Sequence, residues 1–217
     1  MPLTLWLTIL LFEVLLSIVA CIRWKYLDRG MRIVGTSFFV SALSCIIEVI
    51  TGSMGIRNHF VVHLYSLVNF SLLTGAVFIF DRKKSFRTIY GVALVLSVLV
   101  WTVAKFTFEP LETYPNFTDA AASLILIIWA VRLLFLSFRV YSPSVIRNQR
   151  FWVAGGILVA NIGGALSFAT TNILLKHGMA SFALFWHLTW IMNIIADSMF
   201  LYSLFQASPH ALRPRNS

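Results

Sequence analysis

Seven long apolar runs, separated by short polar connections, constrain this chain more than any other feature of its sequence. A helix needs about 20 consecutive, mostly apolar residues to cross the hydrocarbon of a bilayer. Inside a bilayer the backbone must satisfy its own hydrogen bonds, which favours helices. The sequence therefore predicts an all-α membrane protein, a seven-transmembrane-helix bundle that forms a single domain over residues 1–217. The predicted helices cover residues 3–22, 33–54, 59–80, 88–106, 118–138, 152–175 and 180–205.

The composition supports lipid as the solvent of this chain. Hydrophobic residues make up 59% of the sequence, charged residues only 12%, and the mean hydropathy is +0.85. Soluble domains normally carry about 25% charged residues. A net charge of +9 would suggest nucleic-acid binding in a soluble protein. Here the basic residues lie between the apolar runs, so we expect membrane lipids as partners and no nucleic acid.

The distribution of Lys and Arg predicts the orientation of the bundle. Cytoplasmic connections of membrane proteins are enriched in these residues. One side of the predicted bundle carries only Arg57, Lys105 and Lys176, whereas Arg132 lies inside a helix and should extend toward the cytoplasmic interface. We therefore expect the N-terminus outside and the C-terminus in the cytoplasm. The basic residues on the cytoplasmic side are Arg23, Lys25, Arg29, Arg32, Arg82, Lys83, Lys84, Arg87, Arg139, Arg147, Arg150, Arg213 and Arg215.

Polar side chains recur at helical spacing within three of the apolar runs. Ionisable groups are costly in lipid and usually face the bundle interior, where they serve a function. At about 100° per residue, each set falls on one side of its helix. The sets are Ser37, Ser41, Ser44, Glu48 and Thr51; His59, His63, Ser66 and Asn69; and His187, Trp190, Asn193 and Asp197.

These sets predict a polar pocket between the second, third, sixth and seventh helices, open toward the outside. The alternative is a purely structural role, in which the hydroxyls let helices approach closely and the tryptophans form an interfacial belt. We expect the pocket to be lined by Glu48, His63, Asn69, Asn172, His187, Trp190, Asn193 and Asp197.

A metal site is an alternative use of some of the same residues. His59 and His63 are four residues apart, so both lie on one helix face, and two such histidines with a carboxylate can hold Zn²⁺. The candidate ligands are His59, His63, His187 and Glu48. Haem bound through two histidines is a weaker alternative. The seventh run contains no Lys, which argues against a retinal Schiff base.

The pattern from the second run onward resembles an uncharacterised family of short bacterial seven-transmembrane-helix proteins. The resemblance covers roughly residues 40–205, and members of that family often have an acidic residue in place of Asn69 and Asn in place of His63. It implies a seven-helix fold in a bacterial inner (plasma) membrane and no established activity. Its motifs are Glu48, Asn58-His59, His63-Leu64-Tyr65, Asn69-Phe70, Phe151-Trp152 and Asn193.

Three functions fit these observations. The first, which we favour, is a non-enzymatic module that binds or senses a small molecule or lipid and acts with a cytoplasmic or membrane signalling partner. The second is a Zn-dependent intramembrane hydrolase with Asp197 or another carboxylate as its base. The third is a proton-coupled transporter that uses mid-membrane carboxylates such as Glu13 and Asp197.

Overall fold

The computed structural model describes residues 3–56, 58–81, 83–141, 145–177 and 179–206. Side chains are described for these residues except 3–6, 84, 140–141, 172–177, 179–182 and 184. The described chain is helical throughout its regular structure and contains no strand. Seven helices are long and apolar enough to cross a membrane, which confirms the predicted fold class and indicates a multi-pass membrane protein. They are α1 (Leu3–Arg23), α2 (Arg29–Ser53), α3 (His59–Phe80), α4 (Lys84–Thr107), α5 (Asn116–Tyr141), α6 (Gln149–His177) and α7 (Met179–Phe205), with short 3₁₀ turns η1 (Trp24–Tyr26) and η2 (Val145–Arg147).

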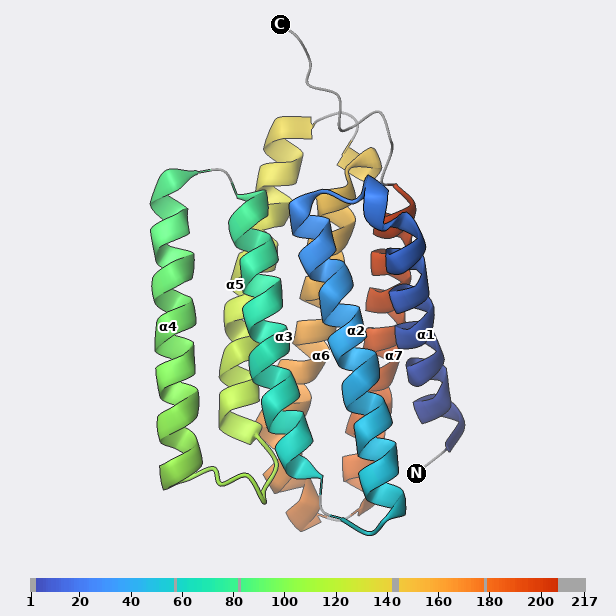
Figure 1. The fold of residues 1–217 in the computed structure, drawn as a ribbon. Coiled ribbons are helices and arrows are strands. Elements are labelled where there is room, and N and C mark those ends of the chain that lie inside the picture. Colours follow the sequence, from blue (N-terminus) through green and yellow to red (C-terminus); the bar gives the residue numbers. More distant parts are fainter. Residues whose placement is uncertain (1–2, 57, 82, 142–144, 178, 207–217) are drawn as a thin grey trace, which may run out of the picture.

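The helices run alternately up and down, so the connections collect at two ends of the bundle (Figure 1). We call the end that carries η1, the α3–α4 connection and η2 the upper end, and the opposite end the lower end. α1 begins at the lower end and α7 finishes at the upper end. The upper end is the one that the basic residues predict to be cytoplasmic.

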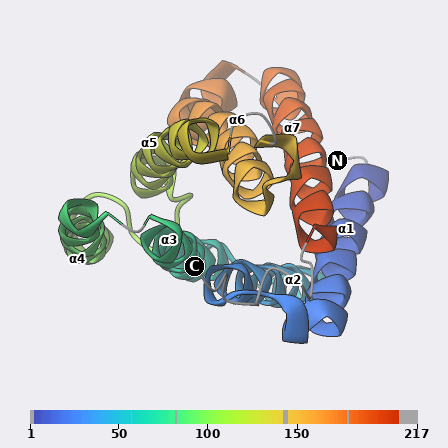
Figure 2. The same ribbon diagram turned by 90° about the horizontal axis from the view of Figure 1, so that it is seen from above.

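Six of the seven helices form a closed ring, and α4 stands outside it. Seen from above, the ring runs α1, α2, α3, α5, α6, α7 and back to α1 (Figure 2). α4 lies beyond α3 and α5, with most of its surface free of other helices. The ring encloses the space in which polar side chains from six helices can meet.

The helices extend beyond the apolar runs because polar residues continue them. α2 begins at Arg29, four residues before the predicted start, where the Asp28 carboxylate accepts a hydrogen bond from the Met31 N–H at 2.8 Å. Such a cap satisfies one of the free N–H groups of a helix start. Hydropathy marks only the part of a helix that lies in hydrocarbon, so it places the start of α2 too late.

Glycines on α6 permit close contact with α7. A Cβ added at Gly156 would meet the Phe200 ring at 2.9 Å, and one at Gly163 would meet the Met192 sulfur at 3.1 Å. Small residues let membrane helices approach closely, which gains van der Waals contact where lipid offers no hydrophobic driving force. The close α6–α7 packing fixes the positions of the polar residues farther along both helices.

An ion pair joins α4 to α5 at the lower end. Lys105 Nζ lies 2.6 Å from Glu109 Oε2 and 3.0 Å from the Thr118 hydroxyl, and both charged residues are buried. Burial raises the pKa of Glu109, but the hydrogen bonds from Lys105 and Thr118, the Lys105 charge and the Phe117 N–H outweigh it and hold the pKa below its ordinary value. Lys105, counted from the sequence among the basic residues of the outer side, is therefore part of the packed structure.

A second ion pair joins the end of α3 to α5 at the upper end, and α4 contributes a hydrogen bond to it. Arg132 Nε donates to Asp81 Oδ2 at 2.6 Å, and the Tyr90 hydroxyl donates to the same oxygen at 2.9 Å. Burial raises the pKa of Asp81, but the hydrogen bonds from Arg132, the Lys83 N–H and Tyr90 outweigh it and lower the pKa. The Arg132 side chain, which we expected to extend toward the cytoplasmic interface, pairs at the upper end of α3 with a carboxylate 51 residues away.

Candidate functional site

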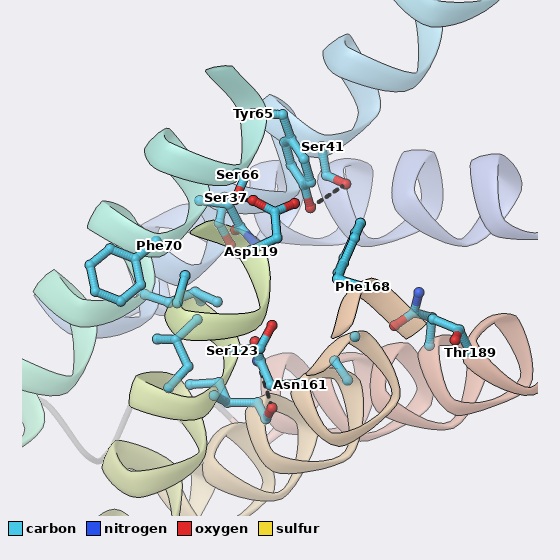
Figure 3. Close-up of a pocket in the computed structure, with 18 of the residues that line it drawn as sticks. Ser37, Ser41, Tyr65, Ser66, Phe70, Asp119, Ser123, Asn161, Phe168 and Thr189 are labelled. Atoms are coloured by element: carbon cyan, nitrogen blue, oxygen red, sulfur yellow. Dashed lines mark hydrogen bonds between the residues drawn. The ribbon is translucent and has the colours of Figure 1, made fainter. Parts of the chain in front are cut away.

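A cavity of about 230 Å³ lies inside the ring of six helices (Figure 3). On α7 its lining extends from Trp186 to Phe200, which is about 21 Å along the helix axis at 1.5 Å per residue. The cavity therefore spans the middle of the bundle, from Asp119 and Trp186 toward the lower end to Phe38 and Phe200 toward the upper end. Its polar lining residues are Glu13, Ser37, Ser41, Tyr65, Ser66, Asn69, Asp119, Ser123, Asn161, Thr189, Asn193 and Asp197.

Three carboxyl groups face this cavity from three different helices. Glu13 comes from the middle of α1, Asp119 from the first turn of α5 and Asp197 from α7. Asp119 is 4% exposed and Asp197 is 5% exposed. Among the residues described as lining the cavity there is no Lys, Arg or His. The cavity is therefore a region of acidic character within a basic protein.

The carboxyl groups differ in how well their oxygens are satisfied. Asp119 accepts a hydrogen bond from the Ser66 hydroxyl across the α3–α5 interface. Glu13 on α1 and Asp197 on α7 lie close enough for their carboxyl groups to interact electrostatically. Glu13 Oε2 and Asp197 Oδ2 are buried and have no hydrogen-bond partner in the described structure. Buried polar atoms are normally paired, so these two oxygens call for an explanation.

Hydroxyl groups fix the walls of the cavity by joining neighbouring helices. The Ser41 hydroxyl on α2 donates to the Tyr65 hydroxyl on α3 at 3.2 Å. Ser167 on α6 and Thr189 on α7 share a buried hydrogen bond. Figure 3 shows the Tyr65–Ser41 pair and Asp119 on one side of the cavity, with Phe168 and Thr189 on another. These contacts hold the cavity open between rigid helices.

Aromatic pairs lie at the two ends of the lining. Phe38 and Phe200 meet edge to face with ring centroids 5.2 Å apart on the upper side. Phe168 and Trp186 meet in the same way at 5.8 Å on the lower side. The cavity thus combines carboxyl, hydroxyl and amide groups with aromatic rings, which is the usual composition of a small-molecule site.

Three of the residues predicted to form the pocket do line the cavity. They are Asn69 on α3 and Asn193 and Asp197 on α7. They lie in the middle of their helices, where the ring of helices leaves its internal space. Asn172 was also predicted, but its side chain lies outside the described residues.

The other predicted pocket residues lie elsewhere. His63 is fully buried, and its Nε2 lies 2.8 Å from the Thr113 carbonyl in the α4–α5 connection. The Glu48 carboxylate accepts a hydrogen bond from Ser44, 3.1 Å away on its own helix. His187 and Trp190 contact each other with ring centroids 5.5 Å apart. None of these four residues is among the residues that line this cavity.

The predicted metal ligands are not assembled into a site. Across the described residues, which include all four candidates, no three His, Cys, Asp or Glu side chains are grouped so that they could hold a metal ion. His59 packs against the Tyr114 ring at 4.4 Å, and His187 Nδ1 contacts the carbonyl of Ala183. The spacing of His59 and His63 on one helix face does not by itself indicate a metal site. In the structure His59 packs against Tyr114, and His63 contacts the Thr113 carbonyl.

The pocket predicted from the sequence did not include two of the three cavity carboxyl groups, although Glu13 was named there as a possible proton carrier. Glu13 is the single charged residue of its apolar run and belongs to no set of polar residues on that helix. Asp119 stands at the start of α5, where an acidic residue is already explained by the positive end of the helix dipole. The signal for Glu13 was its depth, near the middle of a transmembrane helix, where a carboxyl group is costly.

A second, apolar cavity of about 300 Å³ lies where α4 stands away from the ring. Leu67, Phe70, Leu96, Val100 and Ile125 are among its lining residues, and it lies between α3, α4 and α5. Its surface is suited to hydrocarbon and offers few polar groups to a ligand.

Comparisons with known proteins identify no relative. A scan against protein-family models, a search of curated proteins and a search of solved structures found no significant match. The function must therefore be argued from the site itself.

Proposed function

We propose that this chain is a multi-pass membrane protein whose central cavity binds a small polar molecule, and that it serves as a binding or sensing module. The observation that carries the proposal is Asp197 Oδ2, a buried carboxyl oxygen without a partner that faces an internal cavity. A polar ligand would supply the missing partner. A buried carboxyl oxygen without a hydrogen-bond partner costs several kcal/mol in apolar surroundings. Binding of a ligand would offset this cost.

The proposal includes an orientation and a partner. With the upper end in the cytoplasm, the lower part of the cavity, lined by Asp119 and Trp186, lies toward the outside, and the ligand would enter from there. The basic upper end then faces anionic lipid headgroups or an acidic surface on a signalling partner. Reporter fusions after the last residue of the chain and in the α4–α5 connection test this orientation. A cytoplasmic signal from the connection would contradict it.

A substitution that fills the cavity tests whether a ligand binds there. Ala160 lines the cavity from α6, and Ala160→Phe would place a ring in it. Ala169 lies on the exposed surface of the same helix, so Ala169→Phe is the matched control. Small molecules released from the purified full-length proteins are measured by mass spectrometry. We expect one molecule in stoichiometric amount in the wild type and the control, and its loss from Ala160→Phe. Equal contents in all three proteins would refute the proposal.

A proton-coupled transporter is the second candidate function. The juxtaposition of Glu13 and Asp197 near the middle of the bundle favours it, because two neighbouring carboxyl groups can exchange a proton. Proton flux into liposomes that contain the protein tests it. Flux that is abolished by Asp197→Asn would support transport, and absence of flux would leave the binding module. We do not favour the hydrolase alternative, because no three His, Cys, Asp or Glu side chains of the described residues are grouped so that they could hold a metal ion.

A further inference from the structure

The charge of the central cavity constrains what its ligand can be. Glu13, Asp119 and Asp197 line the cavity, whereas the two described ion pairs use Lys105 and Arg132 elsewhere. A carboxylate moved from water into a low-dielectric interior loses several kcal/mol unless a cation or a proton compensates for it. Because Asp197 is 95% buried and one of its oxygens has no partner, the compensating group must come from the ligand or from solvent protons.

The chemistry of the walls distinguishes between kinds of cation. Ca²⁺ requires six to eight oxygen ligands, and Zn²⁺ requires clustered His, Cys or carboxylate groups. The described residues offer no cluster of three such acidic or histidine side chains. An organic ammonium ion needs fewer protein ligands than these metals, since each of its N–H donors requires only one acceptor. Glu13 Oε2 and Asp197 Oδ2 are two acceptors without donors.

The aromatic residues favour an organic cation as well. Phe38, Tyr65, Phe168, Trp186 and Phe200 all line the cavity. The face of an aromatic ring attracts a nearby cation by about 0.5–2 kcal/mol, most strongly when water is excluded. The same rings offer apolar contact to the carbon skeleton of such a ligand.

The size of the cavity sets an upper limit on the ligand. An internal cavity of about 150 Å³ already accepts benzene. This cavity, at about 230 Å³, has room for a molecule with one ring or a short chain, and for its ammonium group. A phospholipid or a peptide would not fit inside the ring of helices.

We propose that the ligand of the central cavity is a small organic ammonium ion, held by Asp197 and Glu13 and surrounded by the aromatic walls. This inference rests on the proposed binding function and adds the class of ligand. It assigns the two carboxyl groups to recognition of charge, and the rings to recognition of the carbon skeleton.

Matched amines and alcohols test the ligand class directly. Ethylamine, butylamine, benzylamine and phenethylamine are compared with ethanol, butanol, benzyl alcohol and phenethyl alcohol on the purified full-length protein in lipid nanodiscs, at pH 7. Binding is measured by isothermal titration and by the shift of the thermal unfolding midpoint. We expect at least one amine to bind tenfold or more tightly than its alcohol, and we expect Asp197→Asn to abolish that preference.

The control variant is Glu112→Gln, which removes an exposed carboxylate far from the cavity lining and should retain the preference. Without ligand, the thermal unfolding midpoint of Asp197→Asn must lie within a few degrees of that of the wild type. If it does not, Glu13→Gln serves as the test variant. Equal binding of every amine and its alcohol would refute the ammonium assignment. A preference that survives both substitutions would refute it too, as would stabilisation by Na⁺ or K⁺ alone.

The outcomes separate this inference from the proposed function. If no amine is preferred but a neutral or anionic molecule is released from wild type and not from Ala160→Phe, the cavity binds a ligand and only the ammonium class is refuted. If the released molecules are the same in all variants and no amine binds, both proposals are refuted.

Discussion

The lower ion pair gives the sharpest prediction about stability, because its members are buried and their partners are known. Glu109 accepts hydrogen bonds at 2.6 Å from Lys105 Nζ, from the Thr118 hydroxyl and from the Phe117 N–H. Lys105→Met keeps an unbranched side chain, one atom shorter, and removes its charge. The carboxylate then remains buried without its cation.

The expected cost of Lys105→Met is about 3–5 kcal/mol of unfolding free energy, the usual penalty for removing one partner of a buried ion pair. Glu109→Gln should cost a similar amount, because it leaves the Lys105 ammonium with Thr118 as its remaining described partner. The double variant removes both charges, so its loss should be smaller than the sum of the two single losses by more than about 1 kcal/mol.

Unfolding in mixed micelles, followed by tryptophan fluorescence, measures these differences. Trp101 lies 5.4 Å from Lys105 Nζ and so reports on this end of α4. Lys25→Met, the same substitution at an exposed residue in η1, is the control and should cost less than about 0.5 kcal/mol. Single losses below about 0.5 kcal/mol, or strict additivity in the double variant, would refute the reasoning and show that water solvates the pair.

Three further predictions follow from the described contacts. The pKa of Glu109 in the folded protein lies below its ordinary value of 4.5, so the pair stabilises the protein above that pH, and the gain is lost as the pH falls through the folded pKa. Glu109→Gln should therefore flatten the dependence of the unfolding free energy on pH below pH 5. An unchanged dependence would contradict this. Asp81→Asn, which leaves Arg132 in the bundle without its carboxylate, should destabilise the fold by about 3 kcal/mol, and retention of the wild-type midpoint would show that Arg132 reaches water. Gly156→Ala should cost about 1–3 kcal/mol through contact with Phe200, whereas Gly75→Ala, with nothing within 4 Å, should not destabilise; equal effects would disprove the close contact.

The sequence was sufficient to predict the seven helices, because hydropathy and length are properties of each segment alone. It was not sufficient to predict that α4 stands outside the ring. That position depends on the Asp81–Arg132 pair, to which Tyr90 of α4 donates a hydrogen bond, and on the connection after α4 folding back so that Glu109 meets Thr118. Neither partnership has a periodic signal, since the first spans 51 residues and the second crosses a turn.

The cavity was only partly predictable for a similar reason. Helical spacing correctly grouped Asn193 and Asp197 on one face of α7. The same reasoning carried the predicted pocket outward to Glu48 and His63, although the α4–α5 connection covers His63 and supplies its hydrogen-bond partner, the Thr113 carbonyl. A connection without periodicity gives no sign in the sequence of which residue it will cover.

The most direct test of the proposed binding function is an experimental density map of the protein in lipid nanodiscs, prepared without added amine. The account predicts compact non-protein density in the central cavity, within hydrogen-bonding distance of Asp197 Oδ2 and absent from the map of the Ala160→Phe variant. A cavity that contains only its own side chains, or density confined to the apolar space between α3, α4 and α5, would contradict it.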